Sequence, residues 1–244
     1  MGRFMRNCVL GIVAAAASAF AAVAADRGPV VVELYTSQGC NSCPPADEYL
    51  GRIADRDDVI ALSLHVDYWD YLGWRDVFGD PAHSRRQRAY AAHMGERMVY
   101  TPQVVVHGQE AMVGSRAVQV DEAIARVSET PDAAAVALSL RGDRLVAEIA
   151  PTDKDAVGAE RARGEVRLVW WSRAEEVAIR SGENRGKRIV YHNVVKGWSD
   201  LGNWRGARIA MTTPKPMGAD GVAVIVQKVA GGPIIGAGRL LLNP

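Results

Sequence analysis

The chain has 244 residues, of which 48% are hydrophobic and 23% are charged. These proportions are those of a globular protein and give no sign of a long disordered segment; the length suits one large domain or two small ones. Its 29 Lys and Arg residues nearly balance 28 Asp and Glu residues, so the net charge gives no support for binding to nucleic acid or to an anionic membrane.

The first 25 residues have the pattern of a signal peptide. Arg3 and Arg6 supply positive charge, residues 9–20 form a short apolar core, and residues 22–24 offer small side chains for cleavage. We therefore expect a periplasmic or secreted protein that has no membrane segment after cleavage, with an uncleaved anchor as the alternative. Cys8 is expected to leave with this segment.

Residues 30–46 contain the most informative pattern. Residues 30–35 form an apolar run that predicts a strand covered on both faces, residues 36–39 favour a turn, and Pro44 and Pro45 suit the first turn of a helix. Cys40 and Cys43 lie between strand and helix. Two cysteines three residues apart cannot connect distant parts of a fold, so they indicate redox chemistry or a metal.

Over residues 59–129 the sequence predicts strands that alternate with helices. Residues 59–65 predict a second strand, parallel to the first, and an aromatic segment leaves its carboxyl end, where α/β folds bind ligands. Asp80 and Pro81 indicate the start of a helix over residues 82–95. A turn at Gly108 and Gln109 then joins two short strands, and residues 120–129 predict a closing helix.

Beyond Pro131 the composition shifts to short β-rich runs separated by glycine-rich turns, which predicts an antiparallel sandwich or curled sheet. We place a domain boundary at residues 130–132, giving domains over 26–131 and 132–244. The runs are residues 134–140, 145–150, 165–172, 188–195, 208–212 and 222–229.

Several motifs together resemble a secreted, thioredoxin-like bacterial family known as a domain of unknown function (family 1223). They are ELYTSQGCNSCPPAD, HVDYWDYLGW, RQRAYA, VYTPQ, GENRG and NVV. The resemblance implies an α/β thioredoxin-like fold, followed here by a mainly antiparallel β domain. It also implies that the Thr101-Pro102 peptide bond is cis and faces the cysteines.

The cysteine spacing predicts a two-step exchange. The amides and the macrodipole at the helix start would lower the pKa of Cys40, making it the attacking thiolate. Cys43, one turn on, would then resolve the mixed disulfide. Pro102 lacks an amide hydrogen and, in the cis form, would turn the backbone of Thr101 toward the sulfurs, where it could pair with an extended substrate.

Other candidates each have a structural alternative. Glu33, the one charge in its strand, is either a buried acid that relays a proton to Cys43 or an exposed strand residue. His65 is either a metal ligand or a hydrogen-bonded core histidine. Tyr68, Trp69 and Trp74 either shield the disulfide and bind substrate or pack the sheet edge. The glycine-rich stretch 182–186 predicts a turn.

The leading hypothesis is a thiol-disulfide oxidoreductase that needs no cofactor. Its partners would be a thiol or disulfide protein, or a small thiol, together with an unidentified electron partner. A second hypothesis is Cu(I) or Zn(II) binding through Cys40, Cys43 and His65. A third is a non-catalytic binding module in which the two cysteines form a structural disulfide.

Overall fold

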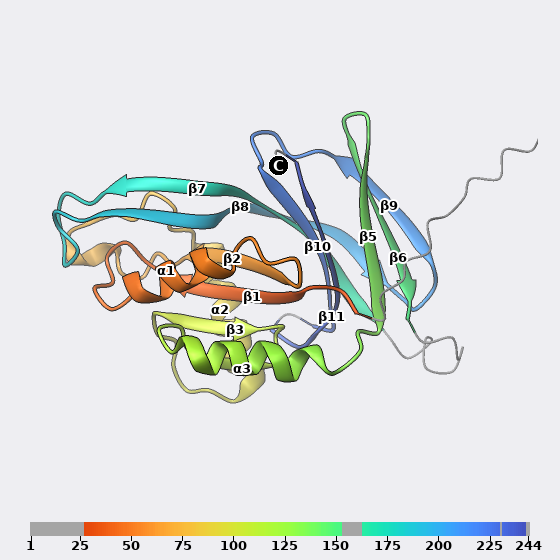
Figure 1. The fold of residues 1–244 in the computed structure, drawn as a ribbon, viewed down its shortest axis with the longest axis horizontal. Helices are drawn as coiled ribbons and strands as arrows, with labels where there is room; N and C mark the ends of the chain where they lie inside the picture. The colour runs from red at the N-terminus through yellow and green to blue at the C-terminus, as the bar shows by residue number, and fades with distance from the viewer. Residues whose placement is uncertain (1–26, 153–162, 230, 243–244) are drawn as a thin grey trace, which may run out of the picture.

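The computed structural model describes residues 27–152, 163–229 and 231–242 (Figure 1). The predicted signal peptide and Cys8 lie outside the described residues. Strands dominate this part of the chain, which has eleven strands against three α-helices. None of its helices is long and apolar enough to cross a lipid bilayer.

The first half begins with β1 (Val30–Thr36), α1 (Pro44–Ile53) and β2 (Val59–His65). β1 and β2 are parallel, in register from Val30 opposite Val59 to Thr36 opposite His65. Both strands are buried along their whole length, as their apolar runs predict. The remaining elements of this half are η1 (Asp70–Leu72), α2 (Pro81–Met94), β3 (Gln103–Val106), β4 (Glu110–Val113) and α3 (Ala117–Ser128).

The second half consists of strands. They are β5 (Ala134–Arg141), β6 (Arg144–Pro151), β7 (Gly164–Ala178), β8 (Arg188–Trp204), β9 (Ile209–Pro214), β10 (Gly221–Gln227) and β11 (Ile234–Leu241). β7 and β8 form a long antiparallel hairpin that reaches along the whole of the first half (Figure 1).

The expected α/β thioredoxin-like fold followed by a mainly antiparallel β domain is wrong. Strands from both halves form one mixed sheet of eight, in the order β11-β10-β7-β8-β2-β1-β3-β4, and only β5, β6 and β9 form a second sheet. The junction is a parallel pairing of β2 with β8, at Ser63 opposite Val194. An apolar strand such as β2 is stabilised by a neighbour on each edge, and β8 supplies the second neighbour.

Three apolar clusters hold the layers together. On one face of β1 and β2, α1 and α3 pack through residues such as Leu50 and Ile124. On the opposite face, Tyr90 of α2 joins side chains of β7, β10 and β11. The third cluster lies between the three-stranded sheet and the strands β7, β10 and β11. Side chains of β1 alternate between the first two clusters, as the period of a strand requires.

A buried ion pair fastens α2 to the large sheet. Glu33 of β1 is fully buried, and its carboxylate accepts bonds from Arg86 Nε at 2.6 Å, Arg86 Nη2 at 3.1 Å and the Tyr90 hydroxyl at 2.5 Å. The same guanidinium donates to Gln227 of β10 at 3.0 Å and lies 4.5 Å from the ring centre of Trp198 in β8. One cation therefore contacts four elements of the fold.

We predict that Arg86→Met lowers the free energy of unfolding by about 3–5 kcal/mol, because it leaves a buried carboxylate without its cation. Adding Glu33→Gln to this variant should recover part of the loss. Urea unfolding measures both. The matched control is Arg188→Met, which removes the exposed pair with Glu176 and should cost about 0–1 kcal/mol. Equal losses for Arg86→Met and Arg188→Met would contradict the assigned role of the buried pair.

Candidate functional site

The turn between β1 and α1 contains a disulfide between Cys40 and Cys43, with their Cα atoms 5.4 Å apart. Cys40 is 2% exposed and Cys43 is fully buried, whereas Asn41 and Ser42 between them are exposed. The disulfide therefore lies just beneath the surface, under a two-residue loop. Cys40 is the half nearer to solvent.

The start of α1 offers fewer free amides than expected. Pro44 and Pro45 have no amide hydrogen, and the amides of Ala46 and Asp47 donate to the carbonyl of Cys43 at 2.8 and 3.1 Å. The Cys40 sulfur instead lies 3.4 Å from the hydroxyl oxygen of Ser42. The Ser42 hydroxyl is therefore the polar side-chain group beside this sulfur at the start of α1.

The Thr101-Pro102 peptide bond is cis. It lies just before β3, whose first residue Gln103 pairs with Tyr35 near the end of β1. The cis turn and the cysteine turn therefore occur at the same end of the sheet. The Thr101 hydroxyl accepts a bond of 2.7 Å from the indole of Trp69.

The two predicted tryptophans flank the turn that carries the cysteines. Trp69 lies against Gly39, where an added Cβ would be 3.3 Å from the Trp69 Cβ, and Trp74 donates its indole hydrogen to the Gln38 side chain at 2.8 Å. Tyr68 instead donates to Gln87 of α2 at 3.1 Å. Trp69 and Trp74 therefore border the cysteine turn, whereas Tyr68 is anchored to α2.

A residue from the second half, which the sequence placed only in a turn, completes the site. Asn184 lies between β7 and β8, is 1% exposed, and donates its side-chain amide to the carbonyls of Gln38 at 2.9 Å and Cys40 at 2.8 Å. The Lys187 ammonium group donates to the side-chain oxygen of Asn184 at 2.7 Å. Figure 1 shows the β7–β8 turn meeting the loops that follow β1 and β2 at one end of the molecule. The GENRG motif thus fixes the backbone of the cysteine turn.

A second unanticipated feature is a buried polar cluster behind the disulfide. Asp47 of α1, Thr36 of β1, His65 of β2 and Tyr191 of β8 are all buried. His65 Nδ1 lies 2.7 Å from a carboxylate oxygen of Asp76, which also accepts the Gln38 amide at 2.8 Å. The cluster is therefore connected to the cysteine turn through Gln38.

Asp47 is unusual within this cluster because neither of its carboxylate oxygens has a hydrogen-bond partner of regular geometry among the described residues. Burial raises the pKa of Asp47 from 3.8 to about 7, and the nearby His65 and Thr36 hydroxyl offset only part of the effect. Asp47 is therefore an acid that changes protonation state near neutral pH.

The other predicted polar candidates, Glu33 and His65, each pair with a side chain outside the cysteine turn. Glu33 faces α2, on the side of β1 opposite α1, and Arg86 and Tyr90 occupy its carboxylate. The structure therefore does not bring Glu33 to Cys43. His65 Nδ1 is taken by Asp76, and the described residues contain no group of three or more His, Cys, Asp or Glu side chains that could hold a metal ion.

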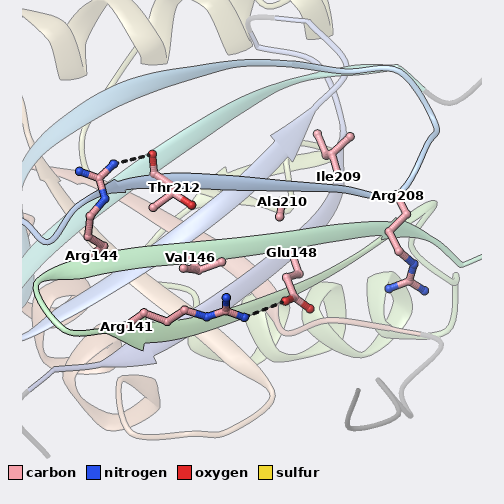
Figure 2. A pocket seen from close by; sticks show the side chains of 8 residues that line it. All are labelled: Arg141, Arg144, Val146, Glu148, Arg208, Ile209, Ala210 and Thr212. Carbon is pink, nitrogen blue, oxygen red and sulfur yellow. Dashed lines mark hydrogen bonds and ion pairs between the residues drawn. The ribbon is translucent and has the colours of Figure 1, made fainter. Parts of the chain in front are cut away.

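A cavity of about 580 Å³ lies away from the cysteines, on the outward face of β6 and β9 (Figure 2). Two of its arginines already have partners, since Arg141 lies 3.8 Å from Glu148 and Arg144 donates to the Thr212 carbonyl at 3.4 Å. Figure 1 places this three-stranded sheet at the far end of the long axis from the turn after β1. The cavity is therefore separate from the cysteine site.

Comparison with known proteins gives a family and two similar structures. A family model described as protein of unknown function (DUF1223) matches residues 31–227. The crystal structure of protein AGR_C_4864 from Agrobacterium tumefaciens is 29% identical with a TM-score of 0.75, covering 89% of this chain and 96% of that one. HBP35 of Porphyromonas gingivalis is 17% identical with a TM-score of 0.57, covering 89% and 76%, and is similar in fold alone. No protein of curated function matches.

We predict that Asn184→Ala destabilises the protein by about 1–3 kcal/mol, because the buried carbonyls of Gln38 and Cys40 lose their donor. Iodoacetamide should also alkylate the reduced cysteines faster, since the turn is no longer fixed. Asn203→Ala, at an exposed position of β8, is the control and should change stability by no more than about 0.5 kcal/mol. Identical alkylation rates in the two variants would show that Asn184 does not restrain the cysteine turn.

We also predict that Asp47→Asn stabilises the protein in a pH-dependent way. Between pH 4 and 7 the folded protein retains the Asp47 proton that the unfolded chain loses, so this group lowers the free energy of unfolding as pH rises. A shift of the pKa from 3.8 to about 7 corresponds to about 4 kcal/mol. In urea unfolding, the free energies of unfolding of wild type and variant should therefore be nearly equal at pH 4 and should differ by about 4 kcal/mol at pH 8. A gap that does not grow with pH would refute the raised pKa.

Proposed function

Because the chain belongs to the family of unknown function whose model matches residues 31–227, we propose its activity from the site itself: exchange of disulfides with a protein or small-thiol substrate through Cys40 and Cys43. The leader-like residues 1–25 support a periplasmic or secreted location. A disulfide persists in that environment until a partner reduces it.

One observation carries the proposal. The disulfide closes a loop over three residues and connects no two elements that the fold does not already hold together. Its contribution to stability is therefore small, because the entropy gained from a cross-link falls as the loop shortens. A disulfide that does little for the fold, at the start of a helix, is better explained by chemistry.

The two cysteines have different roles in this reaction. In the reduced protein, Cys40 is the nucleophile because it lies nearer to solvent and beside the Ser42 hydroxyl. Its thiolate attacks a substrate disulfide, one substrate sulfur leaves as a thiolate, and a mixed disulfide forms. Cys43 then attacks Cys40, which releases the second substrate thiol and restores the disulfide. A separate thiol partner supplies the electrons for the next cycle.

Substrate binding is assigned to the border of the cysteine turn. Trp69 and Trp74 are partly exposed, and each is fixed by an indole hydrogen bond, to Thr101 and to Gln38 respectively. Fixed aromatic side chains supply contact area at a low entropy cost. They would receive an apolar segment beside the scissile disulfide, with the Thr101 backbone as a pairing edge.

The test is disulfide exchange by the purified protein. Wild type should reduce a protein disulfide in the presence of a dithiol. Cys40→Ser should abolish the activity, and Cys43→Ser should accumulate a mixed disulfide visible by mass spectrometry. Ser37→Ala, which removes a hydroxyl that bonds only its own loop, is the control that keeps both cysteines. A wild-type protein no faster than Cys40→Ser would falsify the proposal and favour a purely structural disulfide.

A further inference from the structure

Five buried side chains behind the disulfide have polar atoms without a hydrogen-bond partner of regular geometry among the described residues. The atoms are Thr36 Oγ1, both carboxylate oxygens of Asp47, Ser63 Oγ, His65 Nε2 and the Tyr191 hydroxyl. A buried polar atom without a partner is costly, so such atoms are rare unless they serve a purpose or hold water. Here they come from four different elements.

These side chains lie close together behind the disulfide. Thr36 lies opposite His65 in the β1–β2 register, and Ser63 lies two residues before His65 on the same face of β2. The rings of His65 and Tyr191 are in edge contact, with centres 4.7 Å apart. α1 covers this face through Leu50, so its buried Asp47 points into the same space.

The cluster adjoins the resolving cysteine. Asp47 follows Cys43 by four residues, and its amide donates to the Cys43 carbonyl at 3.1 Å. Residues four apart on a helix share a face, and both side chains are buried, so Asp47 lies one turn along α1 from Cys43 and on the same face. Cys43 is fully buried and has no access to a base in solvent.

We propose that Asp47 is the base that takes the proton of Cys43 when the mixed disulfide is resolved, and that Thr36, Ser63, His65 and Tyr191 line the buried polar space around the Asp47 carboxyl. The inference rests on the proposed exchange reaction. The remaining ionisable groups facing Asp47 are His65, Asp76 and Tyr191.

The proton moves from the Cys43 sulfur to an Asp47 oxygen, and the resulting thiolate forms a bond to the Cys40 sulfur. The bond between Cys40 and the substrate sulfur breaks, and its electron pair leaves with the substrate thiolate. Cys40 and Cys43 are oxidised to the disulfide, and the substrate disulfide has been reduced to two thiols. A carboxyl that titrates near neutral pH is suited to accept and later release this proton.

His65 and Asp76 position this space and do not take part in the transfer. Asp76 accepts bonds from His65 Nδ1 and from the amides of Gln38 and Phe78. The bond at Nδ1 fixes the imidazole, and Nε2 is left without a partner of regular geometry among the described residues. Burial opposes ionisation of Asp76, but His65 and the two amides outweigh it and lower its pKa. A carboxylate at Asp76 therefore leaves Asp47 as the group that gains the proton.

The test separates the two chemical steps. Reduced protein is mixed in a single turnover with an aromatic disulfide whose released thiolate absorbs light. The first release reports attack by Cys40, and the second reports resolution by Cys43. In Asp47→Asn the second release should slow on the order of 100-fold at pH 7, whereas the first should change less than about twofold. Asp47→Glu should recover part of the rate, and Glu48→Gln, an exposed neighbour on α1, should match wild type.

The pH profile gives a readout that a structural role would not move. The wild-type second release should rise with pH up to about 7 and then level off, whereas in Asp47→Asn it should keep rising toward the pKa of the Cys43 thiol. Normal second release in Asp47→Asn would overturn this inference and leave the proposed function intact. No first release in wild type would instead remove the proposed function.

A measurement on the wild-type protein avoids any dependence on variants. The carboxyl carbon of Asp47 can be titrated by NMR in the oxidised and the reduced protein. Coupling to a neighbouring thiol predicts one step in the oxidised form and two coupled steps in the reduced form. The same single step in both forms would overturn the inference.

Discussion

The structure depends on one strand pairing, between β2 and β8. It joins the two halves of the chain into a single sheet, with Ser63 opposite Val194. The side chain of Asn193 strengthens the junction by donating to the Ala61 carbonyl at 3.0 Å. Helix α1 packs against β1 and β2 of the first half and against β8 of the second half. The cysteine turn is thereby held between parts of the chain that are far apart in sequence.

This junction explains why a β-rich second half contributes to a site built on the first half. The β7–β8 hairpin extends past the sheet far enough for its turn to bring Asn184 to the carbonyls of Gln38 and Cys40. Tyr191 on the same hairpin closes the polar cluster around Asp47. On the opposite face of the sheet, the pair of Glu33 and Arg86 is fully bonded and makes no contact with the cysteines. Two of the buried acids thus differ in their surroundings: Glu33 is paired with a cation, whereas Asp47 has no cation bonded to it and its pKa is raised.

Local sequence signals predicted local structure well. The first strand, the proline-opened helix after Cys43, the second strand, and the helix that begins at Pro81 after the Asp80 cap all occur near their predicted positions. The predicted arrangement of the sheets was wrong because neither β2 nor β8 contains a sequence pattern that indicates that the two strands pair. β7 and β8 also run well beyond the predicted spans of 165–172 and 188–195, since their outer ends are polar.

In the site, too, the local motifs were predictable from the sequence, whereas the long-range contacts were not. Cys40, Cys43 and the Thr101-Pro102 step are visible as motifs, and the structure brings their turns to one end of the sheet. Asp47 was missed because an acidic residue in the first turn of a helix normally faces water and favours the helix dipole. Helical spacing from Cys43 and the apolar neighbours Ala46 and Leu50 were the available signal. For Asn184, no signal in its own segment indicates a partner so distant in the chain.

The hydrogen bond from Asn184 to the Cys40 carbonyl joins residues that are 144 positions apart, so it forms only after a long stretch of chain has been made. A ribosome makes the cysteines long before it makes the asparagine that will restrain them. Contacts of such long range form late in folding, after local ones. Before the hairpin docks, the turn lacks this bond, and we expect its two thiols to be more accessible to oxidants than in the folded protein. The oxidation state of a newly made molecule is therefore open to its surroundings during that interval, and the docking of the hairpin ends it.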